Sequence, residues 1–358
     1  MQQREVRHVA VIGTGTIGAS WAAFFLSRGL RVTASDPAPQ AEALLRRFID
    51  TAWPVLTQLR AKTAAPPHDA YDGRAHLEPV PHERALREGL AQVALLQRME
   101  RASGGRLRIA RRVDELTESS PSAATGTRDG DGLAAVLHLE GAEPIGPGLD
   151  ELEVLHAAGL RSLGLVWSRR NAFATGVPFG FPGSPDQGPG LTDAGRALVR
   201  ACGELGIVID VSHLNERGFW EVAELSAAPL VASHSGAHVL CASPRNLTDE
   251  QLRAIGERRG LVGINFFVGF LRADGEDDAD TPLTLIAEHA AHVAQVAGPA
   301  CVALGSDFDG ATMPAALGDV TGLPALLDTL RGAGFTEAEL EGVAAGNWRR
   351  VLAETWAA

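Results

Sequence analysis

GIVIDVSHLNERGFWEVAELSAAPLVASHS, residues 206–235, is the stretch from which the fold of this chain can be predicted. It contains two short apolar runs, Ile207–Val211 and Pro229–Ala232, and each is followed by a histidine, His213 or His234. The residues between the two runs have helical character. Because neighbouring parallel strands need a long crossover, usually a helix, the pattern predicts a strand–helix–strand unit.

The two histidines would follow adjacent parallel strands and would therefore lie close together. In a β/α barrel the carboxyl ends of the strands form the catalytic face. Imidazoles are frequent zinc ligands, so His213 and His234 are candidate ligands of one metal site. The alternative is that each histidine is a polar strand end bonded to backbone. The two in register, together with the acidic residues described below, favour the metal.

Composition limits the class of protein. The 358 residues are 45% hydrophobic, with 40 glycines and 20 prolines, as expected of a globular α/β protein with many turns. A formal net charge of −12 argues against nucleic acid or an anionic membrane as partner. The odd number of well-separated cysteines, three, predicts no disulfide framework. No signal segment and no long apolar run is found, so we expect a soluble cytoplasmic protein.

The N-terminal region has the pattern of a dinucleotide-binding unit. An apolar strand, Val9–Ile12, leads into a glycine-rich turn and a helical segment, and a second strand, Arg31–Ser35, follows. Glycines let the backbone approach a pyrophosphate, and an acid after the second strand can hold a ribose hydroxyl. The candidate cofactor-binding residues are Gly13, Gly15, Gly18 and Asp36.

Residues 5–60, including DPAPQAEALLRRFIDTAWPVL, resemble the opening of 3-hydroxyacyl-CoA dehydrogenases of the carnitine type. The resemblance implies an NAD site. The remaining Rossmann strands and the helical catalytic domain, with its His/Glu pair, do not follow in the sequence. Both alternatives therefore stay open: a working NAD site, or a βαβ unit that no longer binds nucleotide.

The rest of the chain alternates strands and helices. We expect a Rossmann-like segment over residues 1–60, a Pro-rich linker over 61–83 and a catalytic domain over 84–358. Successive strand–helix units predict an α/β fold of the TIM-type (β/α)8 barrel. The predicted strands are Ala134–Leu139, Ser162–Trp167, Ile207–Val211, Pro229–Ala232, Leu261–Phe266 and Cys301–Leu304.

Acidic residues also follow predicted strands. Glu140 comes after the first of the six and Asp307 after the last, and a long Gly/Pro loop over residues 169–190 is suited to covering a site. Catalysis by two divalent metal ions needs such a set. One carboxylate bridges the ions, imidazoles hold one of them, and a further carboxylate handles the proton of the attacking water.

The motifs VLHLEG, IDVSHLNERGFWEV, PLVASHSGAHVLCASPRNLTDEQL, GLVGINF, VALGSDFDG and GNWRRVL resemble the membrane (renal) dipeptidase family of zinc metallopeptidases. The resemblance covers about residues 84–356. It implies that Glu140 is the bridging carboxylate and that His213 and His234 bind the second zinc. It also implies that Asp307 is the acid/base residue and that Arg245 contacts a substrate carboxylate. An arginine fork suits that contact because it can bind a carboxylate bidentately.

Two departures from the family pattern affect the predicted function. No His-x-Asp pair, which would ligate the first zinc, precedes Glu140. The place of the family's substrate-contacting histidine falls at or near Trp167. We therefore expect a zinc-dependent dipeptidase-like hydrolase of short peptides, impaired by the loss of two ligands and holding one zinc. The alternatives are an NAD-binding, 3-hydroxyacyl-CoA dehydrogenase-like protein and a catalytically silent fusion. Homodimer formation is left open.

The strand count raises a question about the N-terminal segment. A closed barrel needs eight strands, and only six follow residue 132. The two strands of the Rossmann-like segment could supply the missing pair, with Val9–Ile12 beside Cys301–Leu304. Otherwise the segment forms a small separate appendage.

Overall fold

The computed structural model describes residues 8–12, 31–35, 46, 79–116 and 133–356. The chain divides into two compact units, Met1–Asp72 and Gly73–Ala358, each of which we describe by itself. The division falls within the stretch 61–83, for which the sequence predicts a linker.

The smaller unit contains two parallel strands, β1 (His8–Ile12) and β2 (Arg31–Ser35). They pair in register from His8 opposite Arg31 to Ile12 opposite Ser35. Both strands are where the sequence predicts them. The candidate nucleotide-binding residues Gly13, Gly15, Gly18 and Asp36 lie outside the described residues.

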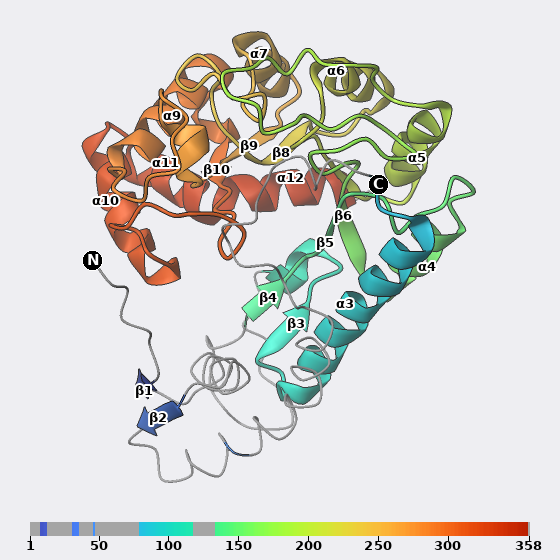
Figure 1. The fold of residues 1–358 in the computed structure, drawn as a ribbon, viewed down its shortest axis with the longest axis horizontal. Coiled ribbons are helices and arrows are strands. Elements are labelled where there is room, and N and C mark those ends of the chain that lie inside the picture. The colour runs from blue at the N-terminus through green and yellow to red at the C-terminus, as the bar shows by residue number, and fades with distance from the viewer. Residues whose placement is uncertain (1–7, 13–30, 36–45, 47–78, 117–132, 357–358) are drawn as a thin grey trace. The chain divides into compact units, whose positions relative to one another are not determined.

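The larger unit is built on a six-stranded parallel sheet whose order is β10-β9-β8-β7-β6-β5 (Figure 1). Each strand pairs with its neighbour along the chain, as in a β/α barrel. All six predicted strands are present, with ends that differ by a few residues. Their bounds are β5 (Leu137–Glu140), β6 (Leu160–Gly164), β7 (Val208–Asp210), β8 (Val231–Ser235), β9 (Leu261–Ile264) and β10 (Val302–Leu304).

Two further short strands, β3 (Leu107–Ile109) and β4 (Leu133–Ala135), form a parallel pair. Only Val136 separates β4 from β5, where the sequence predicts one continuous strand. The first half of this segment pairs with β3 and the second half with β6. The interruption therefore divides one predicted strand between two ladders.

The structure does not confirm the prediction that the Rossmann-like segment completes the barrel. That prediction required β1 to pair with β10, and this pairing is not found among the described residues. Instead β1 and β2 form a two-stranded sheet of their own, and β9 is the neighbour of β10.

Helices connect the strands of the larger unit. Capping boxes begin two of them: Thr248 with Gln251 at α7 (Asp249–Glu257), and Thr336 with Glu339 at α11 (Glu337–Glu341). Short 3₁₀ turns lie at Val113–Leu116, Pro299–Cys301 and Val320–Gly322, and a π-helical turn at Gly342–Gly346. The α-helices are α3 (His82–Ala102), α4 (Asp150–Ala158), α5 (Asp193–Glu204), α6 (Glu216–Leu225), α7 (Asp249–Glu257), α8 (Val268–Leu271), α9 (Thr284–Ala297), α10 (Leu323–Gly332), α11 (Glu337–Glu341) and α12 (Asn347–Trp356).

Helix α12, red in Figure 1, packs against β7, β9 and β10. Its Val351 and Leu352 form an apolar cluster with the first residues of three strands, Val208, Val231 and Leu261. The helix therefore covers the amino-terminal ends of these strands. The carboxyl ends of these strands, which carry the predicted site, are not covered by α12 and lead into loops.

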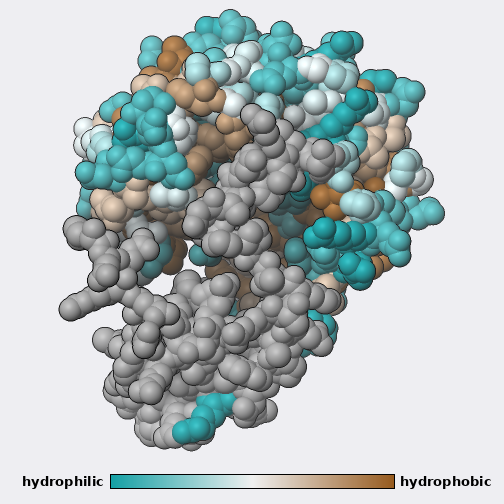
Figure 2. Space-filling view, in the orientation of Figure 1, coloured by the Kyte–Doolittle hydropathy of each residue, from teal (hydrophilic) through white to brown (hydrophobic). Residues whose placement is uncertain are grey.

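The face of the larger unit seen in Figure 2 is mainly hydrophilic among the coloured residues. None of the helices in the described ranges has the length and hydrophobicity needed to cross a membrane. Two large apolar side chains are partly exposed in the loop after β6, Phe179 (42%) and Phe181 (38%). Both belong to the Gly/Pro-rich stretch that the sequence suggests as a cover for the site.

Candidate metal centre

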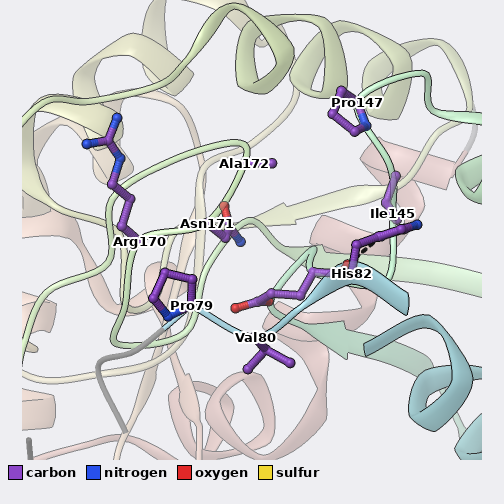
Figure 3. Close-up of a pocket in the computed structure, with 9 residues that line it drawn as sticks. Pro79, Val80, His82, Ile145, Pro147, Arg170, Asn171 and Ala172 are labelled. Atoms are coloured by element: carbon purple, nitrogen blue, oxygen red, sulfur yellow. Dashed lines mark hydrogen bonds between the residues drawn. The ribbon is translucent and has the colours of Figure 1, made fainter. Parts of the chain in front are cut away.

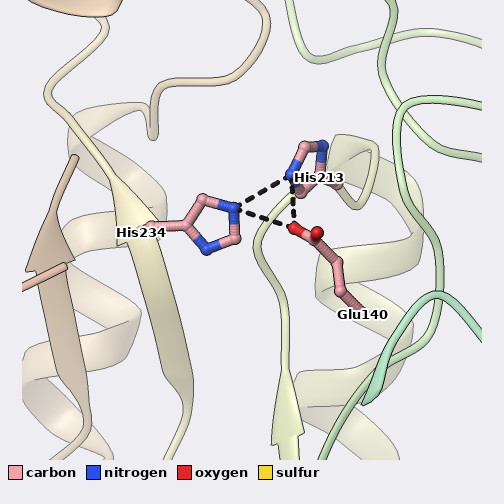
Figure 4. Close-up of side chains that lie close together, drawn as sticks. All are labelled: Glu140, His213 and His234. Atoms are coloured by element: carbon pink, nitrogen blue, oxygen red, sulfur yellow. Dashed lines mark hydrogen bonds and ion pairs between the residues drawn. The ribbon is translucent and has the colours of Figure 1, made fainter. Parts of the chain in front are cut away.

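Three predicted ligands, Glu140, His213 and His234, converge at the carboxyl ends of β5, β7 and β8 (Figure 4). The Oε1 atom of Glu140 lies 3.0 Å from Nε2 of His213 and 3.1 Å from Nε2 of His234. The two Nε2 atoms are 3.0 Å apart. The triad is thus a closed triangle of one carboxylate oxygen and two imidazole nitrogens.

This donor set fits a divalent metal ion. Ligand atoms about 2.1 Å from a tetrahedral zinc ion lie roughly 3.4 Å apart, a few tenths of an ångström more than the separations in the triad. Imidazole nitrogens with one carboxylate oxygen are also the ligand types that zinc binds in hydrolytic sites. Both ring nitrogens on the far side, the Nδ1 atoms, contact serine hydroxyls at 2.7 Å, Ser168 for His213 and Ser233 for His234.

Local backbone geometry turns these side chains toward one point. His213 has a φ of +66°, in the left-handed region that non-glycine residues rarely adopt. Its carbonyl accepts a hydrogen bond from the Val177 amide at 2.8 Å, which holds the turn in place. Unlike His213, His234 lies inside its strand, because β8 extends to Ser235 and not to the predicted end at Ala232.

The protonation states of Glu140 and His213 suit metal binding. Burial alone would raise the pKa of Glu140, but the neighbouring His213 and His234 outweigh it and hold the carboxyl well below its ordinary pKa. Burial, assisted by the nearby Arg245 charge, lowers the pKa of His213 to about 3. At neutral pH the site therefore presents an anionic carboxylate and a neutral His213, the protonation states that a metal ligand requires.

Arg245 and Asp307 border this triad. Burial lowers the pKa of Arg245 to about 10, while Asp307 and Glu140 act in the opposite direction, so the guanidinium stays charged at neutral pH. Its Nη2 donates to the His234 carbonyl at 3.0 Å, and its buried Nε has no hydrogen-bond partner in the described residues. Asp307, with a φ of +58°, accepts a hydrogen bond from Asn265 Nδ2 at 3.1 Å.

Comparison with known proteins gives the family. Residues 47–358 match the family model described as membrane dipeptidase (peptidase family M19). The chain belongs to this family. Residues 8–82 match a second model, the NAD-binding domain of 3-hydroxyacyl-CoA dehydrogenase. Both resemblances inferred from the sequence are thereby confirmed.

Related proteins of the dipeptidase family include solved structures. One is a metallopeptidase from Rhodobacter sphaeroides liganded with a phosphinate mimic of the dipeptide L-Ala-D-Ala, 47% identical, with a TM-score of 0.73 over 78% of this chain and 77% of that one. Another, a dipeptidase of family M19, is 47% identical with a TM-score of 0.73, over 78% of this chain and 80% of that chain. An uncharacterized Klebsiella pneumoniae protein from the pqqA 5′ region is 48% identical over 74% of this chain and 95% of its own length.

An aromatic cluster lies beside the triad of this dipeptidase-family protein. Trp167 lies 6.0 Å from the His213 ring and 5.1 Å, edge-on, from the ring of Phe179. Phe179 in turn stacks on Phe270 at 6.0 Å, and the Arg245 guanidinium lies 5.4 Å from that same Phe270 ring. Trp167 thus faces the candidate metal centre, as its place in the family pattern suggests.

Sequence reasoning missed the residues that hold the ligands. Ser168, Ser233 and Asp210 contact or support the two histidines, and Asn265 contacts Asp307. Each lies within one residue of the end of a predicted strand, so position near a strand end was the available signal. Serine and asparagine are common at such positions for local backbone reasons, which is why the signal does not single them out.

A separate surface pocket of about 290 Å³ lies next to the start of α3 (Figure 3). No triad residue lines it, so it is distinct from the candidate metal centre. Its polar residues are partly engaged with each other and with neighbours: His82 Nδ1 lies 3.0 Å from the Glu143 carbonyl, and Glu143 pairs with Arg169. The lining residues are Pro79, Val80, His82, Glu143, Ile145, Pro147, Arg170, Asn171 and Ala172.

Proposed function

We propose that this chain is a zinc-dependent dipeptidase-like hydrolase of short peptides. The observation that carries the proposal is the triangle of Glu140, His213 and His234, three ligand atoms within 3.1 Å of one another. Membership of the dipeptidase family supports the reaction class. Zinc bound there would supply a Lewis acid for the scissile carbonyl and lower the pKa of the attacking water.

The remaining residues divide the other tasks. Arg245 keeps a buried Nε–H without a partner in the described residues, and a buried donor left unpaired is costly. A substrate carboxylate would satisfy it and would be held near the triad. Asp307, oriented by Asn265, acts as the base for the attacking water and then as the acid for the leaving amine.

The aromatic cluster of Trp167, Phe179 and Phe270 is the part of the site suited to an apolar substrate side chain. Indole and phenyl faces bury apolar groups without offering an acceptor to compete for the peptide amide. Since Trp167 stands where the family has a substrate-contacting histidine, we expect its substrate preference to differ from that of ordinary family members.

We further propose that the activity is low. A bridging carboxylate needs a second ion, and no His-x-Asp pair precedes Glu140 to hold one. A single ion would supply half of the metal charge that two ions would offer to the transition state.

The test is hydrolysis of a panel of dipeptides by the purified full chain, measured after zinc addition and again after chelation. Turnover that depends on zinc and is lost in His234→Ala supports the proposal. A protein that retains bound zinc but cleaves no dipeptide would contradict it and would favour the catalytically silent alternative.

NAD binding by the smaller unit is a second candidate function. It is supported by the match of residues 8–82 to an NAD-binding domain and by the parallel pairing of β1 with β2. The test is a fluorescence titration of the full chain with NADH, with Gly15→Val as control. Saturable binding that the variant loses supports this function, and identical titrations of both proteins contradict it.

A further inference from the structure

A buried carboxylate, Asp210, lies behind the His234 ligand. The residue is 1% exposed and is the last residue of β7, the strand that pairs with the His234 strand, β8. Its Oδ1 accepts two backbone hydrogen bonds, from Ser212 at 2.9 Å and Ser233 at 2.8 Å. Its Oδ2 accepts the Ser233 hydroxyl, and His138 Nε2 lies 3.8 Å from the same atom.

These contacts fix the direction of each hydrogen bond. Oδ1 of Asp210 already accepts two backbone N–H groups, and Oδ2 is the acceptor that faces the Ser233 hydroxyl. The Ser233 hydroxyl must then donate to Asp210. Its oxygen is left to accept from Nδ1 of His234, 2.7 Å away.

We infer that Asp210, acting through Ser233, is a positioning residue that holds the proton of His234 on Nδ1. The inference rests on the proposed function, since its consequence is an Nε2 atom that offers a free lone pair to zinc. Carboxylates that orient a ligand histidine act in this way in other metal sites. Here a serine hydroxyl stands between the carboxylate and the ring.

At His213, no carboxylate among the described residues fixes the direction of the serine hydrogen bond. Its Nδ1 contacts the Ser168 hydroxyl at 2.7 Å, and that hydroxyl has no other hydrogen bond within the described part of the chain. Ser168 can therefore donate or accept. The two ligand histidines differ in this respect, and His234 is the one whose tautomer is determined before metal arrives.

The hydrogen bonds that run from Asp210 through Ser233 to His234 form a relay. Asp210→Asn should reverse their direction without changing the positions of the groups. The two backbone N–H donors at Oδ1 require an acceptor, so the amide oxygen takes that place and the NH₂ group faces Ser233. The Ser233 hydroxyl then accepts from Asn and donates to Nδ1 of His234. The proton of His234 moves to Nε2, where it blocks the metal.

The experiment measures the tautomer and the metal affinity separately, in full-length protein. Long-range ¹H–¹⁵N spectra of the metal-free protein report which ring nitrogen of His234 is protonated, with signals assigned by their loss in His234→Ala. Competition with a chromophoric chelator gives the zinc affinity. Ser233→Ala and Ser233→Thr test the relay. The matched control is Ser162→Ala, which removes the hydroxyl 2.9 Å from Nδ1 of His138 and leaves the relay intact.

We expect the wild type and Ser233→Thr to carry the proton on Nδ1, and Asp210→Asn to carry it on Nε2. Zinc affinity should fall about 10- to 100-fold in Asp210→Asn and Ser233→Ala, and by less than about threefold in Ser233→Thr and Ser162→Ala. If Asp210→Asn does not fold, Ser233→Ala, which keeps the buried carboxylate, carries the test.

Two results would overturn the inference: a wild-type His234 protonated on Nε2, or zinc affinity unchanged in both Asp210→Asn and Ser233→Ala. The predicted tautomer in a wild-type protein that binds no zinc would instead support the relay and contradict the proposed function.

Discussion

His213 shows how a single residue joins backbone strain to chemistry. A left-handed, non-glycine residue costs of the order of 1–3 kcal/mol, and such residues gather at functional sites. His213, with its φ of +66°, has this strained conformation in the turn after β7, which directs its ring toward the candidate metal centre. Asp307, at +58°, has the same kind of conformation after β10. Both strained residues carry predicted chemistry.

The first prediction separates ligands from the acid/base residue. Asp307→Asn should lower kcat by at least about 100-fold and leave zinc content unchanged, because an amide keeps the shape but cannot transfer the proton. His213→Ala and His234→Ala should lose both zinc and activity, since each opens the coordination sphere. Zinc content and initial rates, measured on the same preparations, check this. Loss of zinc in Asp307→Asn would assign that carboxylate as a ligand instead.

The second prediction concerns the aromatic cluster. Phe179→Ala should raise KM for dipeptides with large apolar side chains by roughly tenfold, with little effect on kcat, because it removes about 1.5 kcal/mol of apolar contact. Phe181→Ala is the matched control: it lies in the same loop with similar exposure, and its ring packs against Gly275. Equal KM changes in the two variants would argue against a substrate-binding role for Phe179.

At the scale of elements, helix α9 is tied to the site by a buried histidine. His289 is 1% exposed; its Nδ1 accepts from the Ala237 amide at 2.9 Å, and its Nε2 donates to the Leu271 carbonyl at 3.1 Å. The ring therefore links the turn after β8 to the end of α8. It can do so only when neutral, because one nitrogen must accept.

The third prediction follows from burial, which lowers the pKa of His289 from 6.5 to about 4. Between these values the unfolded state binds the proton more strongly, so stability falls as pH drops through this window and the loss is complete below about pH 4. The loss is of the order of 3 kcal/mol. Urea unfolding at pH 7 and pH 4.5 should show a smaller pH effect in His289→Gln, whose amide mimics both hydrogen bonds.

His292→Gln provides the control for this measurement. It lies on the same helix, but its Nε2 contacts Asp249 at 2.8 Å nearer the surface, with its side chain 20% exposed. The same pH dependence in wild type and His289→Gln would show that His289 does not account for the acid sensitivity.

Much of the element order could be predicted from sequence, and the exceptions have physical causes. Buried parallel strands are continuous apolar runs, so all six strands of the main sheet were recognisable. The break at Val136 was not, since it arises from pairing with two different neighbours, β3 and β6.

The candidate site, like the fold, could be predicted in part. Chemically distinctive candidate ligands near strand ends, Glu140, His213 and His234, were identified, and the structure brings them together. The groups that orient them are ordinary serines and a buried aspartate. Their role depends on contacts between strands that only the folded chain provides, such as Ser233 beside Asp210.

At the scale of the whole molecule, the fourth prediction is that the purified chain holds at most about one tightly bound zinc. Within the described ranges, Glu140, His213 and His234 are the one group of three or more ligand side chains that can converge on an ion. Elemental analysis of freshly purified protein checks this. Two equivalents would contradict it and would direct attention to ligands such as Asp36, His68 and Asp69, which lie outside the described residues.

The sequential order of β5 to β10 has a consequence for recombination between genes. Because each of these strands pairs with its neighbours along the chain, a crossover in a loop between two units breaks a single ladder and leaves the others whole. A hybrid made near one end of the series keeps most of its native pairing. Exchange of sequence ahead of β5 would therefore leave every ladder of the six-stranded sheet whole.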